Sequence, residues 1–330
     1  SDIANKYEPM AEQRLDLSVM AEKMESVKQE VKKVIIGQDE VIHKLMICML
    51  ASGHALLEGM PGVGKTLTAK LLAKSIHGTF KRIQFTPDLM PSDVTGSSIL
   101  DLKSNEFEFK KGPIFGNIVL IDEINRAPAK TQSSLFECMS ERQVTVDGVT
   151  YAMPLPFLVF ATQNPIEHDG TYRLPEAQLD RFLYKINIGY PNLEQEIEIL
   201  REHHGQQALL KDAQVQPVLS VEDLSGFQQL IKSVYVHDDV FSYIGQVILN
   251  TRSHPHLTLG ASPRASLAIL DASKAHAALQ QRDFLTPADI KYVAPSVLGH
   301  RVQLTPEKEM EGFASDFIVS QIVDSVEIPR

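Results

Sequence analysis

The chain of 330 residues is long enough to bury a substantial core, in one large or two ordinary domains. Hydrophobic residues make up 43 % of it and charged residues 22 %, which excludes wholesale disorder and fibrous structure, and no apolar run approaches the roughly 20 residues of a membrane helix. The net charge of −10 argues against a protein whose main task is to bind nucleic acid. The two cysteines, Cys48 and Cys138, are too few for a disulfide framework and fit a reducing cytoplasm.

The first half of the chain has the pattern of an α/β domain. Residues 1–16 are polar and are expected to form a poorly ordered leader, and helices are expected over 17–31, 39–52 and 66–77. Short apolar runs separated by helical or loop stretches indicate a parallel sheet covered on both faces. The expected strands are 54–59, 81–86, 117–123, 157–163 and 184–190.

Two inserts interrupt this rhythm, and the pattern changes after Pro191. Residues 97–111 are expected to form a hairpin, and residues 143–153 alternate around the turn signal Asp147-Gly148. Beyond Pro191 the strand signal vanishes, so we expect an α/β core at 17–190 and an all-helical domain at 191–330. The expected helices of the second domain are 194–204, 221–233, 239–252, 263–281 and 286–298.

The strongest motif is a phosphate loop, which is Gly, four residues, then Gly-Lys-Ser/Thr. Its residues are Gly59, Met60, Pro61, Gly62, Val63, Gly64, Lys65 and Thr66, with Leu67 next in the helix. Glycines let backbone N–H groups turn toward phosphates, Lys65 supplies a positive charge, and Thr66 supplies a hydroxyl to Mg²⁺. The guanine-reading motif Asn-Lys-x-Asp is absent, which favours ATP over GTP.

Polar side chains follow two of the expected strands. Asp122 and Glu123 end one strand, and carboxylates at this edge of an open α/β sheet lie where ligands bind. We expect Asp122 to hold Mg²⁺ through water and Glu123 to polarise the attacking water; the alternative is a solvated strand end. Asn164 follows the next strand and is expected to position that water, unless it only caps the turn before Pro165.

Two arginines are candidates for contact with the γ-phosphate. Arg181 follows Asp180 near the sheet edge, and Arg264 opens a helix of the second domain. A guanidinium on the γ-phosphate strongly favours phosphoryl transfer, although an arginine taken alone is more often part of a surface ion pair. The basic pair Lys81-Arg82 is expected to be solvated.

The order of these motifs resembles that of an AAA+ ATPase. Three strings further resemble the MoxR family, a branch of AAA+ that carries a helix-2 insert, and the resemblance extends from Leu17 to the C-terminus. These strings are Arg82 to Gly96, Asp122 to Pro128 and Thr171 to Phe182. The resemblance implies a phosphate-loop NTPase core with a five-stranded parallel sheet, followed by a helical lid.

The resemblance also implies roles for single residues. Lys65 and Thr66 match Walker A, Asp122 and Glu123 match Walker B, Asn164 matches sensor 1, and Arg264 matches sensor 2. Gly37 and Gln38 match the segment beside adenine, residues 97–111 match the helix-2 insert, and residues 143–153 match the hairpin before sensor 1. Arg181 matches the arginine finger that reaches a neighbouring subunit's nucleotide, although Arg173 and Arg126 are alternatives for that role.

Members of such a family are similar to chaperone-like machines. The resemblance implies Mg²⁺-dependent ATP hydrolysis in a homo-oligomeric ring, with a hexamer expected. The work would be remodelling or maturation of a client protein, by metal insertion or complex assembly, together with a von Willebrand A-type partner. The alternatives are a nucleic-acid motor, which the net charge of −10 and the lack of a basic or aromatic surface disfavour, and a non-catalytic ATP-binding switch, which Glu123 disfavours.

Overall fold

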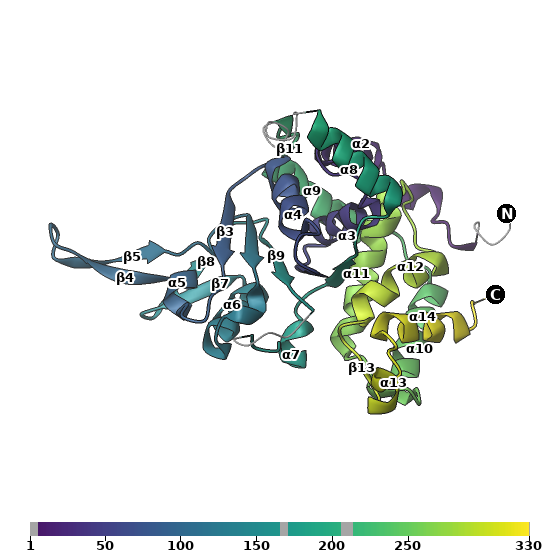
Figure 1. The fold of residues 1–330 in the computed structure, drawn as a ribbon. Helices are drawn as coiled ribbons and strands as arrows, with labels where there is room; N and C mark the ends of the chain where they lie inside the picture. The colour runs from purple at the N-terminus through teal and green to yellow at the C-terminus, as the bar shows by residue number, and fades with distance from the viewer. Residues whose placement is uncertain (1–5, 166–170, 206–213, 330) are drawn as a thin grey trace.

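The structure, a computed structural model, describes residues 6–165, 171–205 and 214–329 (Figure 1). Its centre is a parallel five-stranded sheet in the order β10-β1-β9-β6-β3. The strands are β1 (Ala55–Gly59), β3 (Phe80–Gln84), β6 (Ile118–Asp122), β9 (Leu158–Gln163) and β10 (Tyr184–Ile188). All five expected strands are therefore confirmed, and their carboxyl ends meet at one edge of the sheet.

Helices cover both faces of this sheet. Alternate strand residues enter different hydrophobic clusters: Leu57 and Leu120 pack with α2, α3 and α4, whereas Leu56 and Val119 pack with α6. The helices are α2 (Ser18–Lys32), α3 (Asp39–Leu50), α4 (Lys65–Lys74) and α6 (Ala129–Glu141). The first three were expected from the sequence, whereas α6 was not.

The two inserts form hairpins, as predicted. After the short helix α5 (Pro91–Thr95), β4 (Gly96–Asp101) and β5 (Glu106–Lys111) pair in a ribbon that projects far from the sheet (Figure 1). Strands β7 (Gln143–Val146) and β8 (Val149–Ala152) are joined by a turn in which Asp147 and Gly148 both have positive φ. The hairpins touch, because Ser98 donates a hydrogen bond to Asp147 at 2.6 Å.

The remainder of the chain is helical apart from short strands. Its helices are α8 (Leu193–His204), α9 (Val221–Leu230), η5 (Ile231–Ser233), α10 (Asp238–Ser253), α11 (Pro263–Leu279), α12 (Pro287–Leu298), α13 (Pro306–Met310) and α14 (Ser315–Ser325). Strands β12 (Leu257–Leu259) and β13 (Gln303–Leu304) pair within it, and β11 (Leu219–Ser220) pairs with β2 (Ile76–His77) of the core. Helices α13 and α14 and these short strands were not expected from the sequence.

Core and lid share packing across the expected boundary at residue 190. The side chain of Gln228 in α9 donates a hydrogen bond to the carbonyl oxygen of Met49 in α3 at 2.8 Å. A single hydrophobic cluster also runs from α2 and α3 into α10, α11 and α14. The division into residues 17–190 and 191–330 stays a prediction, because the packing does not break there.

Residues 6–16, the described part of the expected loose leader at residues 1–16, make specific contacts with the rest of the chain. Tyr7 is fully buried, and its hydroxyl donates to the carbonyl oxygen of Pro329 at 3.0 Å. After the turn η1 (Ala11–Gln13), Arg14 Nε and the backbone N–H of Leu15 both donate to one oxygen of Asp283, at 3.0 and 2.9 Å. Residues 1–5 lie outside the described residues. Within the described ranges, no helix is long and apolar enough to cross a membrane.

Candidate nucleotide site

The phosphate loop lies between the end of β1 and the start of α4. Gly62 and Gly64 both have positive φ, of 86° and 82°, a conformation that glycine adopts without strain. A side chain at Gly62 would meet no atom within 4 Å, so this residue lies at the open crest of the loop. Met60 and Leu67, at the two ends of the turn, are partly buried against the core. The loop is therefore anchored at its ends and open where an anion can approach the N-terminus of α4.

Lys65 connects the loop to the end of β9. Its ammonium group donates to the carbonyl oxygen of Gly59 and to Oδ1 of Asn164, both at 2.5 Å. Burial lowers the pKa of Lys65, and the nearby carboxylates of Glu123, Glu58 and Asp122 oppose that shift. The structure thus brings together Lys65 and Asn164, which lie 99 positions apart in the sequence.

Thr66 and Asp122 face each other across the sheet edge. The Thr66 hydroxyl donates to Oδ1 of Asp122 at 2.8 Å, and the carboxylate is almost fully buried. A hydroxyl and a carboxylate are the oxygen ligands that Mg²⁺ prefers, so this pair fits a magnesium ion. The second oxygen, Oδ2, accepts a hydrogen bond from Arg82 Nε at 2.6 Å. Arg82 is half exposed, as expected of a solvated basic pair, but it also pairs with Asp122 because β3 lies beside β6 in the sheet.

Glu123 begins the turn η2 (Ile124–Arg126) and has a left-handed backbone, with φ of 54°. Its backbone N–H donates to the Thr162 hydroxyl at 3.1 Å, which fixes the turn to β9. The side chain stays about one-third exposed and accepts hydrogen bonds from Gln84 Nε2 at 3.1 Å and Arg126 Nη1 at 2.9 Å. A carboxylate held in this way, within reach of solvent, can act on a water molecule.

Gly37 and Gln38 lie against the phosphate loop from the N-terminal side. Gln38 donates to the carbonyl oxygen of Val63 at 3.1 Å and accepts from the Thr68 hydroxyl at 2.7 Å. Gly37 has a φ of 68°, and a side chain there would collide with Gln195 of α8. The two residues therefore lie where the loop, α3 and α8 meet, and their position beside adenine stays a prediction.

The candidate arginines have different surroundings. Arg181, after α7 (Glu176–Leu179), donates to the carbonyl oxygen of Phe136 at 2.9 Å and to the Ser140 hydroxyl, both in α6. Arg126 is paired with Glu123, and Arg173 is exposed. Arg264 is exposed in the first turn of α11. Arg181 and Arg126 thus bond to partners outside the phosphate loop, and a trans-acting role for Arg181, Arg173 or Arg126 stays a prediction.

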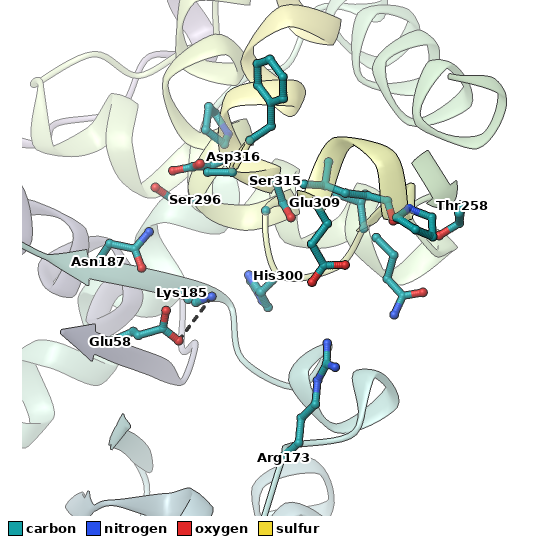
Figure 2. A pocket seen from close by; sticks show the side chains of 18 of the residues that line it. Glu58, Arg173, Lys185, Asn187, Thr258, Ser296, His300, Glu309, Ser315 and Asp316 are labelled. Atoms are coloured by element: carbon teal, nitrogen blue, oxygen red, sulfur yellow. Dashed lines mark hydrogen bonds and ion pairs between the residues drawn. The ribbon is translucent and has the colours of Figure 1, made fainter. Parts of the chain in front are cut away.

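A cavity of about 630 Å³ lies between the carboxyl ends of β1 and β10 and the lid. Figure 2 shows Glu58 and Lys185 facing it from β1 and β10, with Arg173 on the opposite side and His300 of the lid between them. Gln163 donates to Glu58 at 2.7 Å, which connects the cavity to the end of β9 beside Asn164. Glu58 was not among the predicted site residues, although a polar residue at the carboxyl end of an apolar strand could have indicated it.

Two residues missed by sequence analysis contact the two acids. Arg82 and Gln84 lie on one face of β3 and donate to Asp122 and to Glu123. The alternation of residues 81–85 gives a signal for that face, but the neighbour of β3 in the sheet cannot be read from the order of the strands in the sequence. These contacts therefore depended on knowing the sheet order.

Comparison with known proteins identifies the family of the chain. Residues 54–184 match the family model "ATPase family associated with various cellular activities (AAA)", and residues 249–322 match the AAA lid domain. Chaperone MoxR1 of Mycobacterium tuberculosis is 43% identical over 91% of this chain and 81% of its own length. Protein YeaC of Bacillus subtilis is 47% identical over 91% of this chain and 93% of its own length.

Two more comparisons bear on family and fold. Protein MoxR of Methylorubrum extorquens is 30% identical over 86% of this chain and 88% of its own length. A crystal structure of a candidate ATPase from Cytophaga hutchinsonii has a TM-score of 0.87 and 41% identity, covering 95% of this chain and 97% of that one. Together with the phosphate loop and the acidic pair, these matches show that the chain belongs to the MoxR family of AAA+ ATPases.

Proposed function

We propose that this chain is a Mg²⁺-dependent ATP hydrolase that works as an oligomeric ring, with six subunits expected, and remodels or matures partner proteins as a chaperone does. As an AAA+ ATPase of the MoxR family it acts on ATP. The observation that carries the catalytic part is the meeting of Lys65, Thr66, Asp122, Glu123 and Asn164 at one sheet edge.

Each of these residues has a chemical task in this proposal. Lys65 and the loop N–H groups bind the phosphates, and Thr66 and Asp122 hold Mg²⁺, which when bound neutralises charge on the transferring phosphate. Glu123 takes up the proton of the attacking water, for which its partly exposed carboxylate is suited. Asn164, whose Oδ1 faces Lys65, keeps the lysine aligned and orients the water.

Exposed apolar surface supports association between subunits. Helix α8 has no buried residue along its described length, and it presents Leu193, Ile197 and Leu200 on one face, exposed by 75%, 38% and 66%. A stripe of this kind on a helix is typical of a surface that another protein covers. In the proposed ring a neighbouring subunit completes the site with Arg181, and Arg264 acts from the lid.

The projecting hairpin supports a client-binding role. Leu102 and Phe107 near its tip are 86% and 75% exposed, far from the sheet (Figure 1). Such side chains fit contact with a client protein, and a von Willebrand A-type partner is proposed to cooperate with the ring. Cys48 and Cys138 are buried free thiols, which supports action in the cytoplasm.

The proposal is tested by ATP turnover per subunit at increasing protein concentration with Mg²⁺. We expect turnover to rise with concentration, and Glu123→Gln to bind ATP without hydrolysing it. Arg181→Ala is expected to lose the concentration-dependent turnover, with Arg173→Ala and Arg126→Ala as comparisons for the choice of arginine. Tight ATP binding without turnover at any concentration would favour a switch over a hydrolase.

Mixing two inactive variants tests the site between subunits directly. A ring that contains Glu123→Gln and Arg181→Ala subunits has some interfaces with an intact Glu123 on one side and an intact Arg181 on the other. Turnover should therefore reappear on mixing, although each variant alone is inactive. If the mixture stays inactive while the two variants are shown to assemble together, Arg181 acts within its own chain.

A further inference from the structure

Asp122 divides its two carboxylate oxygens between two different partners. Oδ1 accepts from the Thr66 hydroxyl at 2.8 Å, and Oδ2 accepts from Arg82 Nε at 2.6 Å. The Asp122 side chain is only 6% exposed, so salt screens this ion pair weakly. Each oxygen of this carboxylate thus has a donor, and one of the two donors carries a full positive charge.

The position of Arg82 follows from the sheet. Strand β3 is the outermost strand and pairs with β6 in parallel register, with Gln84 opposite Asp122. Arg82 lies two residues before Gln84 on the same face, so its long side chain reaches along the strand to the carboxylate. The side chain remains half exposed, which means that its charge can move into solvent without being buried elsewhere.

A divalent cation bound at Thr66 and Asp122 therefore meets a guanidinium on the same carboxylate. The guanidinium cannot lose its proton, so the two positive charges repel each other at any physiological pH. The cation must either displace Arg82 or bind beside it more weakly. In both cases Arg82 opposes cation binding, and its departure to solvent is the step that relieves the repulsion.

We propose that Arg82 is an internal counter-ion of Asp122 that competes with the divalent cation and so sets the cation concentration that nucleotide binding requires. The inference rests on the proposed function, because it takes Thr66 and Asp122 as the cation ligands. Arg82 is a positioning residue in this account, since it acts on the cation only through Asp122. The competing account is that Arg82 orients Asp122 for the cation, which predicts the opposite change on substitution.

The test is a titration of the full chain with Mn²⁺ in the presence of ADP. Binding is measured by electron paramagnetic resonance, as the loss of the signal of free Mn²⁺. We expect Arg82→Gln to lower the half-saturating Mn²⁺ concentration by about tenfold, the effect of removing one charge-assisted hydrogen bond. Arg82→Lys keeps a positive charge and should retain most of the original Mn²⁺ requirement. Lys81→Gln is the matched control, because it removes the same charge from the opposite face of the same strand and should shift the value less than about twofold.

The outcomes separate this inference from the proposed function. If Arg82→Gln raises the Mn²⁺ requirement or leaves it unchanged, the competition is refuted while the cation site stands. If the unsubstituted chain and Asp122→Asn bind Mn²⁺ equally, the cation ligands themselves are wrong. The affinity for ADP without metal is measured on the same variants, and a variant that has lost it has failed to fold. If Arg82→Gln fails in this way, the Mn²⁺ requirement of Arg82→Lys is compared with that of the unsubstituted chain instead.

Discussion

His54 gives the chain a defined sensitivity to acid. Its ring is buried between β1, β9 and α6, where Nδ1 accepts from the N–H of Val159 at 2.9 Å and Nε2 lies 3.1 Å from the carbonyl oxygen of Met139. This pattern holds one neutral tautomer, and burial lowers the pKa of His54 from 6.5 to about 4. The unfolded chain therefore binds more protons than the folded chain between these two values, so stability falls as pH drops through that window.

The size of this effect follows from the pKa difference. Between pH 6.5 and 4, His54 alone should remove about 1.4 kcal/mol of unfolding free energy per pH unit, and about 3 kcal/mol in all. We predict that the stability difference between the unsubstituted chain and His54→Gln shrinks by this amount as pH falls. Urea unfolding at several pH values measures it, and the other buried histidines cancel because both proteins contain them.

The exposed residue His77 provides the control. The difference in unfolding free energy between the unsubstituted chain and His77→Gln should not change as pH falls. A stability difference between the unsubstituted chain and His54→Gln that stays constant from pH 6.5 to 4 would refute the reasoning. It would mean that His54 takes up its proton in the folded chain as easily as in the unfolded one.

Three further substitutions test the packing that supports the site. Asn117→Ala removes a buried side chain that accepts from Thr79 N–H and donates to the Pro156 carbonyl oxygen, and should lower the unfolding free energy by about 2 kcal/mol in urea titrations. Tyr7→Phe loses the hydrogen bond to the chain end, and thermal unfolding should show a loss of about 1 kcal/mol. Arg301→Lys cannot reproduce the contacts of the buried guanidinium with Asp180 and with the Phe182 carbonyl oxygen, and a loss of about 2 kcal/mol is expected in the same assay.

The phosphate loop was predictable because its chemistry is local. The glycines, Lys65 and Thr66 lie together in the sequence, and the apolar run before them identified the strand that carries the loop. The acidic pair was predictable for a related reason, since an apolar strand that ends in acids indicates the sheet edge. The sequence alone thus predicted the sheet and the five residues of the proposed catalytic cluster, although their catalytic roles stay predictions.

The features that sequence reasoning missed depend on contacts between distant segments. Arg82 reaches Asp122 only because β3 and β6 are neighbours, and the order of strands in a sheet is not encoded in any local pattern. Residues 6–16 read as a polar leader because one buried tyrosine in a polar segment gives no periodic signal, yet Tyr7 bonds to Pro329 and Leu15 bonds to Asp283, both far away in the sequence. In both cases tertiary contacts decided the structure.

One short segment, Asp180 to Phe182, connects the lid with the candidate trans-acting arginine. From the lid, Arg301 donates to the carbonyl oxygens of Asp180 and Phe182 at 3.0 and 2.8 Å, and His300 lies 2.7 Å from the second of them. Arg181, between these two residues, extends the other way to α6. Because both sides of the segment are held by hydrogen bonds, we expect a displacement of the lid relative to the sheet to move Arg181, unless it first breaks the bonds from Arg301. A site completed by Arg181 of a neighbour would therefore respond to the lid of that neighbour.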